Sequence, residues 1–219
     1  MFGKTILFSE MIPDSAWEAD FNEWYDTEHI PVRMRAPGFV GAQRYHGVDS
    51  PAYLAVYEME SPAALATPEY KEIKGSPSDR TRKMLNGVTG FTRYIGVESG
   101  HWDAPAGAVN DAPVLYAVFF EVPPQHADEF DRWYVEDHIP TLMKCEDWLK
   151  VRRFEIVDGE PGKYTHLALH YLASTAALSS PERDEARRSP WRARLAAQDW
   201  FKGHYVVFEK HGQRFKAAL

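Results

Sequence analysis

Hydrophobic and polar positions change their period along the chain in the same order in each half. Residues 5–11 and 114–122 have the alternation of strands, and residues 15–35 and 126–144 have the spacing of helices. In the first half the remaining elements are a hairpin, a second helical region and a final strand, over residues 39–46 with 53–59, about 62–85, and 91–98. The order β, α, β, β, α, β predicts an α+β ferredoxin-like unit, in which two helices cover one face of a sheet.

An internal repeat explains why this order recurs. A shift of 109 residues pairs residues 21–45 with 130–154, so that FNEWYDTEHIPVRM recurs as FDRWYVEDHIPTLM. Farther along the chain the shift becomes 113, and the extra residues fall around Gly159. Because this segment is rich in turn-forming residues, we expect a longer hairpin loop there.

The repeat divides the chain into two predicted ferredoxin-like α/β-barrel units, residues 1–98 and 113–219. Residues 99–112, which include Gly107 and Asn110, have the composition of a linker. A ferredoxin-like sheet has a second face that must be covered. Two tandem units can therefore pack sheet to sheet as an intramolecular dimeric α/β barrel.

The repeated string W-Y-x-x-E/D-H-I-P, followed by a strand that ends in R-Y or R-F, resembles the dimeric α/β-barrel superfamily, particularly its EthD-like branch. The resemblance implies a small-molecule pocket between sheet and helices. In several branches it implies cofactor-free cyclisation, isomerisation, dehydration or decarboxylation of aromatic, polyketide-like or lactone compounds, whereas other branches carry haem. The usual member is one unit that dimerises, so the fusion of two unequal units here makes the equivalence of the two sites doubtful.

The helix that carries the motif places a carboxylate among aromatic residues. At 100° per residue, Glu28 lies on the same arc as Trp24 and Tyr25, so we expect it to face inward. His29 lies on the flank of that arc, and Pro31 removes a backbone hydrogen bond and should bend the helix. The second copy repeats the arrangement with Trp133, Tyr134, Asp137, His138 and Pro140.

In the functional interpretation, each copy is a candidate acid–base site. The histidines transfer the proton and the carboxylates orient or share it, which gives the candidate catalytic residues His29, His138, Glu28 and Asp137. The aromatic rings enclose the substrate and the arginines steady an anionic group, at Trp24, Tyr25, Arg44, Trp133, Tyr134 and Arg153. In the structural alternative, the carboxylates pair with the arginines, the histidines cap carbonyls freed by the prolines, and the rings are core.

The second half adds three candidate substrate-binding histidines, His166, His170 and His204. The first two share one face of a predicted strand, and the third, on the last strand, could join them. Three imidazoles could bind a transition metal or haem, but no carboxylate-histidine ligand spacing supports either, so we predict no metal and no cofactor. We favour the second half as the working site because it has these additional histidines.

Other features of the sequence are predicted to be inert. Cys145 has no activating partner, and residues 183–194 mix both charge signs in the manner of a solvated helix face. The chain lacks a phosphate loop, a G-x-S-x-G elbow and a dinucleotide fingerprint, which excludes the kinase, serine hydrolase and nicotinamide classes.

Composition narrows the partners. The 219 residues include 25 Lys plus Arg and 32 Asp plus Glu, and the net charge of −7 gives no reason to expect nucleic acid or an anionic membrane as a partner. A single cysteine excludes an internal disulfide, and the chain has no apolar run of membrane-spanning length, so we expect a cytoplasmic protein. The 7 Trp, 11 Tyr and 12 Phe indicate a small-molecule pocket. A homodimer of the fused chain is a further expectation.

Together these features predict a cofactor-independent lyase or isomerase, acting by decarboxylation, dehydration or ring rearrangement. Its substrate would be a hydrophobic, oxygenated and aromatic small molecule. Two alternatives stay open. One is a non-catalytic small-molecule-binding or assembly protein, and the other is a haem or metal oxidoreductase centred on the second half.

Overall fold

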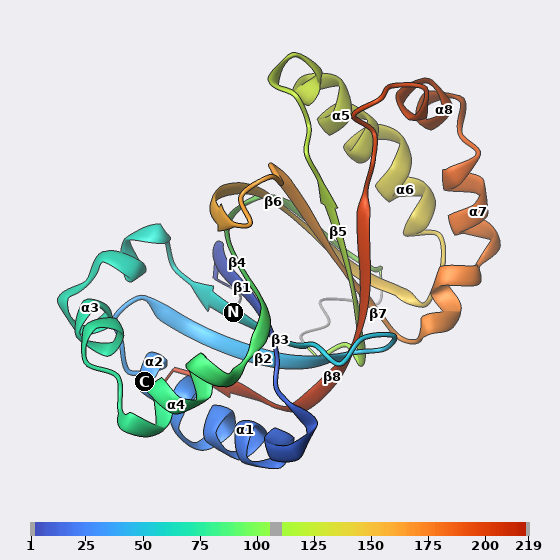
Figure 1. The fold of residues 1–219 in the computed structure, drawn as a ribbon. Helices are drawn as coiled ribbons and strands as arrows, with labels where there is room; N and C mark the ends of the chain where they lie inside the picture. Colours follow the sequence, from blue (N-terminus) through green and yellow to red (C-terminus); the bar gives the residue numbers. More distant parts are fainter. Residues whose placement is uncertain (1–2, 106–110, 218–219) are drawn as a thin grey trace. The chain divides into compact units, whose positions relative to one another are not determined.

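A computed structural model describes residues 3–105 and 111–217 (Figure 1). The chain forms two compact units. Unit 1 comprises Met1–Val97, Val157–Gly162 and His211–Leu219, and unit 2 comprises Glu98–Ile156 and Lys163–Lys210. Three strands, β4 (Thr89–Asp103), β6 (Trp148–Glu160) and β8 (His204–Lys216), begin in one unit and end in the other.

Unit 1 is built on the antiparallel ladder of β1 (Thr5–Ile12), β2 (Phe39–Gly47) and β3 (Tyr53–Met59). β1 lies between β3 and the first part of β4, and β2 pairs with the other edge of β3. The helical segments of this unit are η1 (Ser15–Trp17), α1 (Glu18–Trp24), η2 (Tyr25–His29), α2 (Ile30–Arg33), η3 (Pro62–Ala66), α3 (Pro68–Gly75) and α4 (Asp79–Gly87).

Unit 2 repeats this arrangement. β5 (Val114–Phe120) lies between β7 (His166–Leu172) and β8, and the first part of β6 pairs with β7. The helical segments are η4 (Pro124–His126), α5 (Ala127–Trp133), η5 (Tyr134–His138), α6 (Ile139–Leu142), η6 (Thr175–Ser179), α7 (Pro181–Arg187) and α8 (Pro190–Ala196). The class is α+β, and the eight strands follow the cyclic hydrogen-bonding order β1-β3-β2-β8-β5-β7-β6-β4 of a closed antiparallel barrel.

Two predictions from the sequence need correction in detail. The residues inserted near Gly159 lengthen strand β6 rather than the hairpin loop, because residues 48–52 and 161–165 connect the two hairpins with loops of the same length. β4 continues to Asp103, so the first residues of the predicted linker belong to a strand. Gly107 and Asn110 lie outside the described residues.

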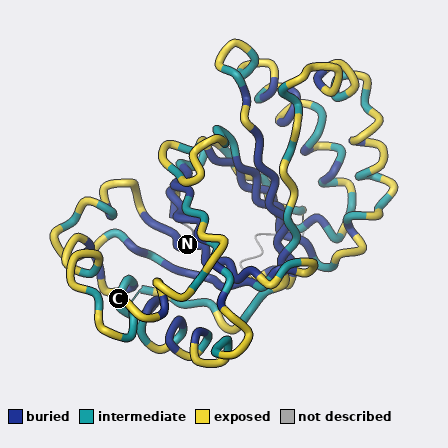
Figure 2. The backbone as a smooth tube through the Cα atoms, viewed as in Figure 1, coloured by how far each residue is buried: buried dark blue, intermediate teal, exposed yellow. Residues whose placement is uncertain are grey.

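Each unit has its own hydrophobic core between one face of its strands and its helices. Alternate residues of a strand point to the same face, so Leu7 and Met11 of β1 join the core of unit 1, and Val118 and Phe120 of β5 join that of unit 2. In Figure 2 strands β1, β2, β3, β5 and β7 are largely buried, and the loops and outer helix turns are exposed. None of the helices in the described ranges is long and apolar enough to cross a membrane.

Candidate functional site

Both copies of the repeated motif wind into a π-helical turn. Ile30 donates its backbone N–H to the carbonyl of Tyr25, and Ile139 donates to Tyr134, each spanning five residues. Pro31 and Pro140 follow directly and have no N–H to donate, which is the local reason the α-helical ladder is interrupted. The bend expected at the prolines therefore takes the form of a π-turn, a distortion that often marks functional sites.

The π-turn brings the motif's histidine onto its aromatic residues. The ring centroid of His29 lies 4.3 Å from that of Trp24 and 4.7 Å from that of Tyr25. In unit 2 the corresponding distances from His138 are 4.6 Å to Trp133 and 5.2 Å to Tyr134. All four aromatic residues are buried, and Trp24 also donates its indole N–H to the Thr81 hydroxyl at 3.1 Å.

The motif's carboxylates do not face inward as expected. Glu28 is only partly buried and accepts hydrogen bonds from Ser78 and Thr81, and Asp137 accepts one from Ser189 at 2.6 Å. Ser78 and Ser189 are the N-cap residues of α4 and α8. Each carboxylate thus connects the π-turn to the start of a neighbouring helix. The extra residue in a π-turn changes the helical spacing, so the carboxylate no longer lies on the same face as the apolar residues.

The expected pairing of these carboxylates with the arginines is also wrong. Arg44 pairs with Asp26 at 2.8 Å, and Arg153 pairs with Asp131. Each guanidinium also lies over the ring of the motif's tyrosine, Tyr25 or Tyr134, at 4.6 Å from the centroid. Both arginine side chains are buried, so these contacts hold the helix against the strand in each unit.

Unit 2 contains a cavity of about 290 Å³ between its strands and helices. Its walls combine aromatic rings, aliphatic side chains, two histidines and three arginines. The lining residues are Tyr116, Val118, Phe120, Trp133, Tyr134, His138, Leu142, Trp148, His170, Leu178, Arg183, Arg187, Arg192, Phe201, Tyr205 and Val207. The cavity brings together four of the predicted site residues, Trp133, Tyr134, His138 and His170.

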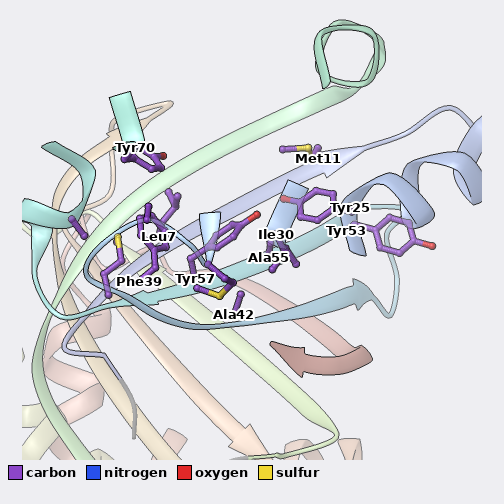
Figure 3. Close-up of a cluster of buried hydrophobic side chains, with 14 of the residues drawn as sticks. Leu7, Met11, Tyr25, Ile30, Phe39, Ala42, Tyr53, Ala55, Tyr57 and Tyr70 are labelled. Carbon is purple, nitrogen blue, oxygen red and sulfur yellow. The ribbon is translucent and has the colours of Figure 1, made fainter. Parts of the chain in front are cut away.

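In unit 1 the cluster of buried hydrophobic side chains includes Phe39, Tyr57 and Tyr70 (Figure 3). Phe39 and Tyr57 stand where unit 2 has Trp148 and His170. The ring of Tyr70 stacks on Phe39 with centroids 5.3 Å apart, and both Tyr57 and Tyr70 are buried. His29 instead borders a different hollow, which is lined by charged and polar side chains of the helical segments, including Glu28, Arg33, Arg35, Glu69, Glu72 and Lys74.

His170 is held in one protonation state and one tautomer. Trp148 donates its indole N–H to Nδ1 of His170 at 3.0 Å within the core. Since indole can only donate, Nδ1 must accept, and in the neutral ring the proton is on Nε2. Burial holds the pKa of His170 at about 3, with the charges of Arg153 and Arg183 adding to the effect. Nε2 is buried without a hydrogen-bond partner, and the His170 side chain lines the cavity.

His138 is also neutral near pH 7. Burial lowers its pKa well below the usual value, and the positive charge of Arg192 lowers it further. Its Nδ1 is buried and has no partner. Burial raises the pKa of Tyr134 above its usual value, so the phenol stays protonated. The cavity therefore offers a neutral imidazole, an imidazole N–H and a phenol in an apolar enclosure.

The other two histidines of the row lie outside the cavity. His166 contacts the Thr165 hydroxyl at 2.8 Å and lies 3.7 Å from Asp131 at the Arg153 ion pair. His204 does not lie on the same face of the sheet as His166 and His170. In the register of β5 with β8, His204 is opposite Phe119, whereas in the register of β5 with β7, His166 is opposite Phe120. Adjacent residues of a strand point to opposite faces, so the expectation of a common row is wrong for His204.

The histidines do not fit a metal or haem site. A metal-bound imidazole normally donates its second N–H to an acceptor, which leaves the other nitrogen free for the metal. In His170, Nδ1 is itself the acceptor, so the remaining nitrogen, Nε2, carries the proton of the neutral ring and cannot bind a metal. Within residues 3–105 and 111–217, no group of three or more His, Cys, Asp or Glu is arranged to hold a metal ion.

The three arginines of the cavity were not among the site residues predicted from the sequence. Arg183 and Arg187 come from α7 and Arg192 from α8, in the segment that was predicted to be a solvated helix face. The available signal was the spacing of four residues between Arg183 and Arg187, which places two like charges on one side of a helix. Cys145 is partly buried against the core of unit 2 and does not line the cavity.

Comparisons with known proteins identify the fold. The structure is similar to that of an anthrone oxidase-like protein, with a TM-score of 0.72 and 14% identity over 98% of this chain and 94% of the other. The fold is similar to that of the dimeric α/β-barrel proteins. A Fusobacterium nucleatum protein provisionally described as a monooxygenase has a TM-score of 0.61 and 11% identity, over 100% of this chain and 98% of the other.

A mutant chlorite dismutase from Candidatus Nitrospira defluvii also has a TM-score of 0.61, with 8% identity over 95% of this chain and 90% of the other. At such identities the similarity shows the fold alone. The model of a domain of unknown function, DUF4286, matches residues 113–214. Among curated protein sequences, none matches the chain.

Proposed function

We propose that unit 2 is the catalytic unit of a cofactor-independent lyase or isomerase that acts on a hydrophobic, oxygenated aromatic molecule. The observation that carries the proposal is the pair of neutral imidazoles that line one cavity, His138 with a buried, unpartnered Nδ1 and His170 with a buried, unpartnered Nε2. An acid–base enzyme needs a group that accepts a proton and a group that stabilises the charge left behind. The two histidines supply one of each.

The reaction begins with removal of a proton from a carbon next to a carbonyl or phenol-type ring. The proton passes to His138, and the electron pair of the broken C–H bond moves onto the substrate oxygen to form an enolate. The N–H of His170 donates to that oxygen, and the positive guanidiniums of the cavity stabilise its negative charge. Return of the proton to another carbon gives an isomer, and loss of a neighbouring leaving group gives the product of a lyase.

The electrostatics of the cavity support this order of events. The positive charges that lower the pKa of His138 also stabilise the enolate and so lower the pKa of the substrate C–H bond. The base and the substrate therefore stay matched in pKa. Once the enolate has formed, its charge favours the protonated form of His138.

We infer that unit 1 is a structural copy of the same module, in a tandem fusion of two EthD-like units. Its π-turn, its tyrosine–arginine contact and its serine-bound carboxylate match those of unit 2. The His170 position is occupied by Tyr57, and the corresponding space is filled by core side chains. His29 therefore has the inherited motif without a cavity lined by strand residues.

The proposed proton abstraction can be tested on 1,8-dihydroxyanthrone, because its methylene C–H is acidified by a ketone and by two aromatic rings. In D₂O under nitrogen, proton NMR should show protein-dependent loss of the methylene signal. The His138→Gln variant should lower the exchange rate about 10²- to 10⁴-fold, and His29→Gln, the matched variant of unit 1, should leave it unchanged.

Equal exchange by wild type and His138→Gln would overturn the assignment of the base, as would loss of exchange only in His29→Gln. Admitting air gives a second measurement with an oxygen electrode. The proposal expects no protein-dependent oxygen uptake. Uptake in proportion to substrate loss would replace the lyase or isomerase assignment with an oxidase.

A further inference from the structure

The three arginines of the unit 2 cavity have no acidic partners. Within the described parts of the chain, Arg183, Arg187 and Arg192 take no part in the salt bridges that occupy Arg44, Arg152 and Arg153. No Asp or Glu is found among the described residues that line the cavity. Arg187 is exposed, and Arg183 and Arg192 are half-buried. Because three positive charges at one cavity repel one another, a negatively charged ligand would stabilise the arrangement.

Two of these guanidiniums are positioned by the backbone of their own segment. Arg183 donates from Nη1 to the carbonyl of Leu178 at 2.6 Å, and Arg192 donates from Nη1 to the carbonyl of Arg187 at 3.2 Å. Arg183 also interacts with the hydroxyl of Tyr116, which lines the same cavity. The guanidinium of Arg192 also lies 5.7 Å from the ring centroid of Phe201, which limits its motion further.

The polar groups of the cavity are suited to a ligand that accepts hydrogen bonds. His170, which is 1% exposed, has its unpartnered Nε2–H there, and Trp133 has a buried indole N–H without a partner. The arginines can only donate. The remaining lining is dominated by aromatic and aliphatic side chains, which suit the faces of a planar ring.

We infer that the ligand of this cavity is an aromatic carboxylate, with its ring among the aromatic walls and its carboxylate on the guanidiniums of Arg183, Arg187 and Arg192. A planar, two-oxygen anion matches the fork of a guanidinium. A volume of about 290 Å³ suits a compact ligand of one to three fused rings. The inference names the substrate class of the site in the proposed function and rests on that proposal only for the claim that the ligand is then transformed.

Isothermal titration calorimetry with 1-naphthoate and 1-naphthamide tests the inference, because the two probes have nearly the same shape and differ in charge. Wild-type protein at pH 7 should bind naphthoate at least about 10-fold more tightly than naphthamide. Arg187→Gln and Arg192→Gln should each raise the Kd of naphthoate about 10- to 100-fold and leave that of naphthamide within about twofold. Arg187→Lys should recover part of the loss.

The chain offers matched controls. Arg188, which directly follows α7, is next to Arg187, and Arg194 on α8 is two residues from Arg192. Neither lines the cavity. Arg188→Gln and Arg194→Gln should therefore leave both Kd values within about twofold of wild type. Circular dichroism of each variant establishes that it is folded.

Three results would overturn the inference: equal binding of the two probes, equal loss of naphthoate binding in the test and control variants, or no naphthoate binding by folded wild-type protein. These results are distinct from failure of the proposed function. Charge-selective binding without proton exchange on the anthrone would retain the carboxylate and reject the enzyme. Exchange that depends on His138 without charge selectivity would do the reverse.

Discussion

Trp148 donates its indole N–H to Nδ1 of His170 at 3.0 Å, and this buried contact determines which nitrogen of His170 can serve a ligand. Phe39 and Tyr57 occupy the aligned positions in unit 1, so the tautomer-selecting pair belongs to unit 2 alone. Trp148 is thus a positioning residue. It acts on the cavity through the ring of His170.

Replacing the donor should release the tautomer. In Trp148→Phe we expect the ring of His170 to populate both neutral tautomers, and the free energy of unfolding to fall by about 1 to 3 kcal/mol because a buried acceptor is left unpaired. Long-range ¹⁵N–¹H correlation spectra of the imidazole report the tautomer directly. Trp191→Phe is the control, because the indole N–H of Trp191 has no hydrogen-bond partner to lose. An unchanged His170 spectrum in Trp148→Phe would contradict the role of Trp148.

Protein stability should depend on pH through His170. Its pKa is about 3 in the folded state, against about 6.5 for an unperturbed histidine, so between these values the unfolded chain binds the extra proton. Titration of His170 therefore does not reduce the free energy of unfolding above pH 6.5. Below pH 6.5 it reduces the free energy of unfolding by up to about 1.4 kcal/mol per pH unit as the pH decreases.

Urea titrations at several pH values between about 4.5 and 6.5 measure this slope. His170→Gln, which retains an acceptor for Trp148, should give a shallower slope than wild type. The exposed His101 provides the control variant, His101→Gln, which should keep the wild-type slope. Identical slopes for wild type and His170→Gln would show that the titration of His170 does not contribute.

Asp137 should matter for stability more than for chemistry. Its carboxylate accepts from Ser189 at the start of α8 and does not line the cavity. Asp137→Ala should lower the free energy of unfolding by about 1 to 2 kcal/mol and change the rate of anthrone exchange by less than about twofold. Glu136→Ala, which removes an exposed ion pair with Arg132, should cost less than about 0.5 kcal/mol. A large fall in exchange rate with intact stability would return Asp137 to a catalytic role.

Trp24 should behave as a core residue. Its side chain is 0% exposed and its indole N–H bonds to Thr81, so Trp24→Ala should lower the free energy of unfolding by about 3 to 5 kcal/mol. A denaturant titration gives the value. A loss below about 1 kcal/mol would instead indicate that the ring forms the wall of an open pocket.

The sequence by itself determined the local structure of this protein. The periods of apolar residues gave the order of strands and helices, because a period reflects the backbone geometry of a few neighbouring residues. Pro31 and Pro140 located the break in the motif's helices, because a missing N–H acts on the turn that contains it. The motif's histidines lie next to their aromatic neighbours because these residues are one turn apart on the same helix.

Only the tertiary structure decided which of these residues share a cavity. Asp131 rather than Asp137 reaches Arg153, and the ladder of β5 and β8 turns His204 away from His170. Such pairings depend on the register of segments far apart in the sequence. Whether a unit has a cavity depends on the total volume of side chains from many elements. In unit 1, Tyr70 stands where unit 2 has Arg183, and its ring packs on Phe39. The sequence could not show that Arg183, Arg187 and Arg192 line a cavity, because a charged helix face has the same sequence pattern whether it faces water or a binding cavity.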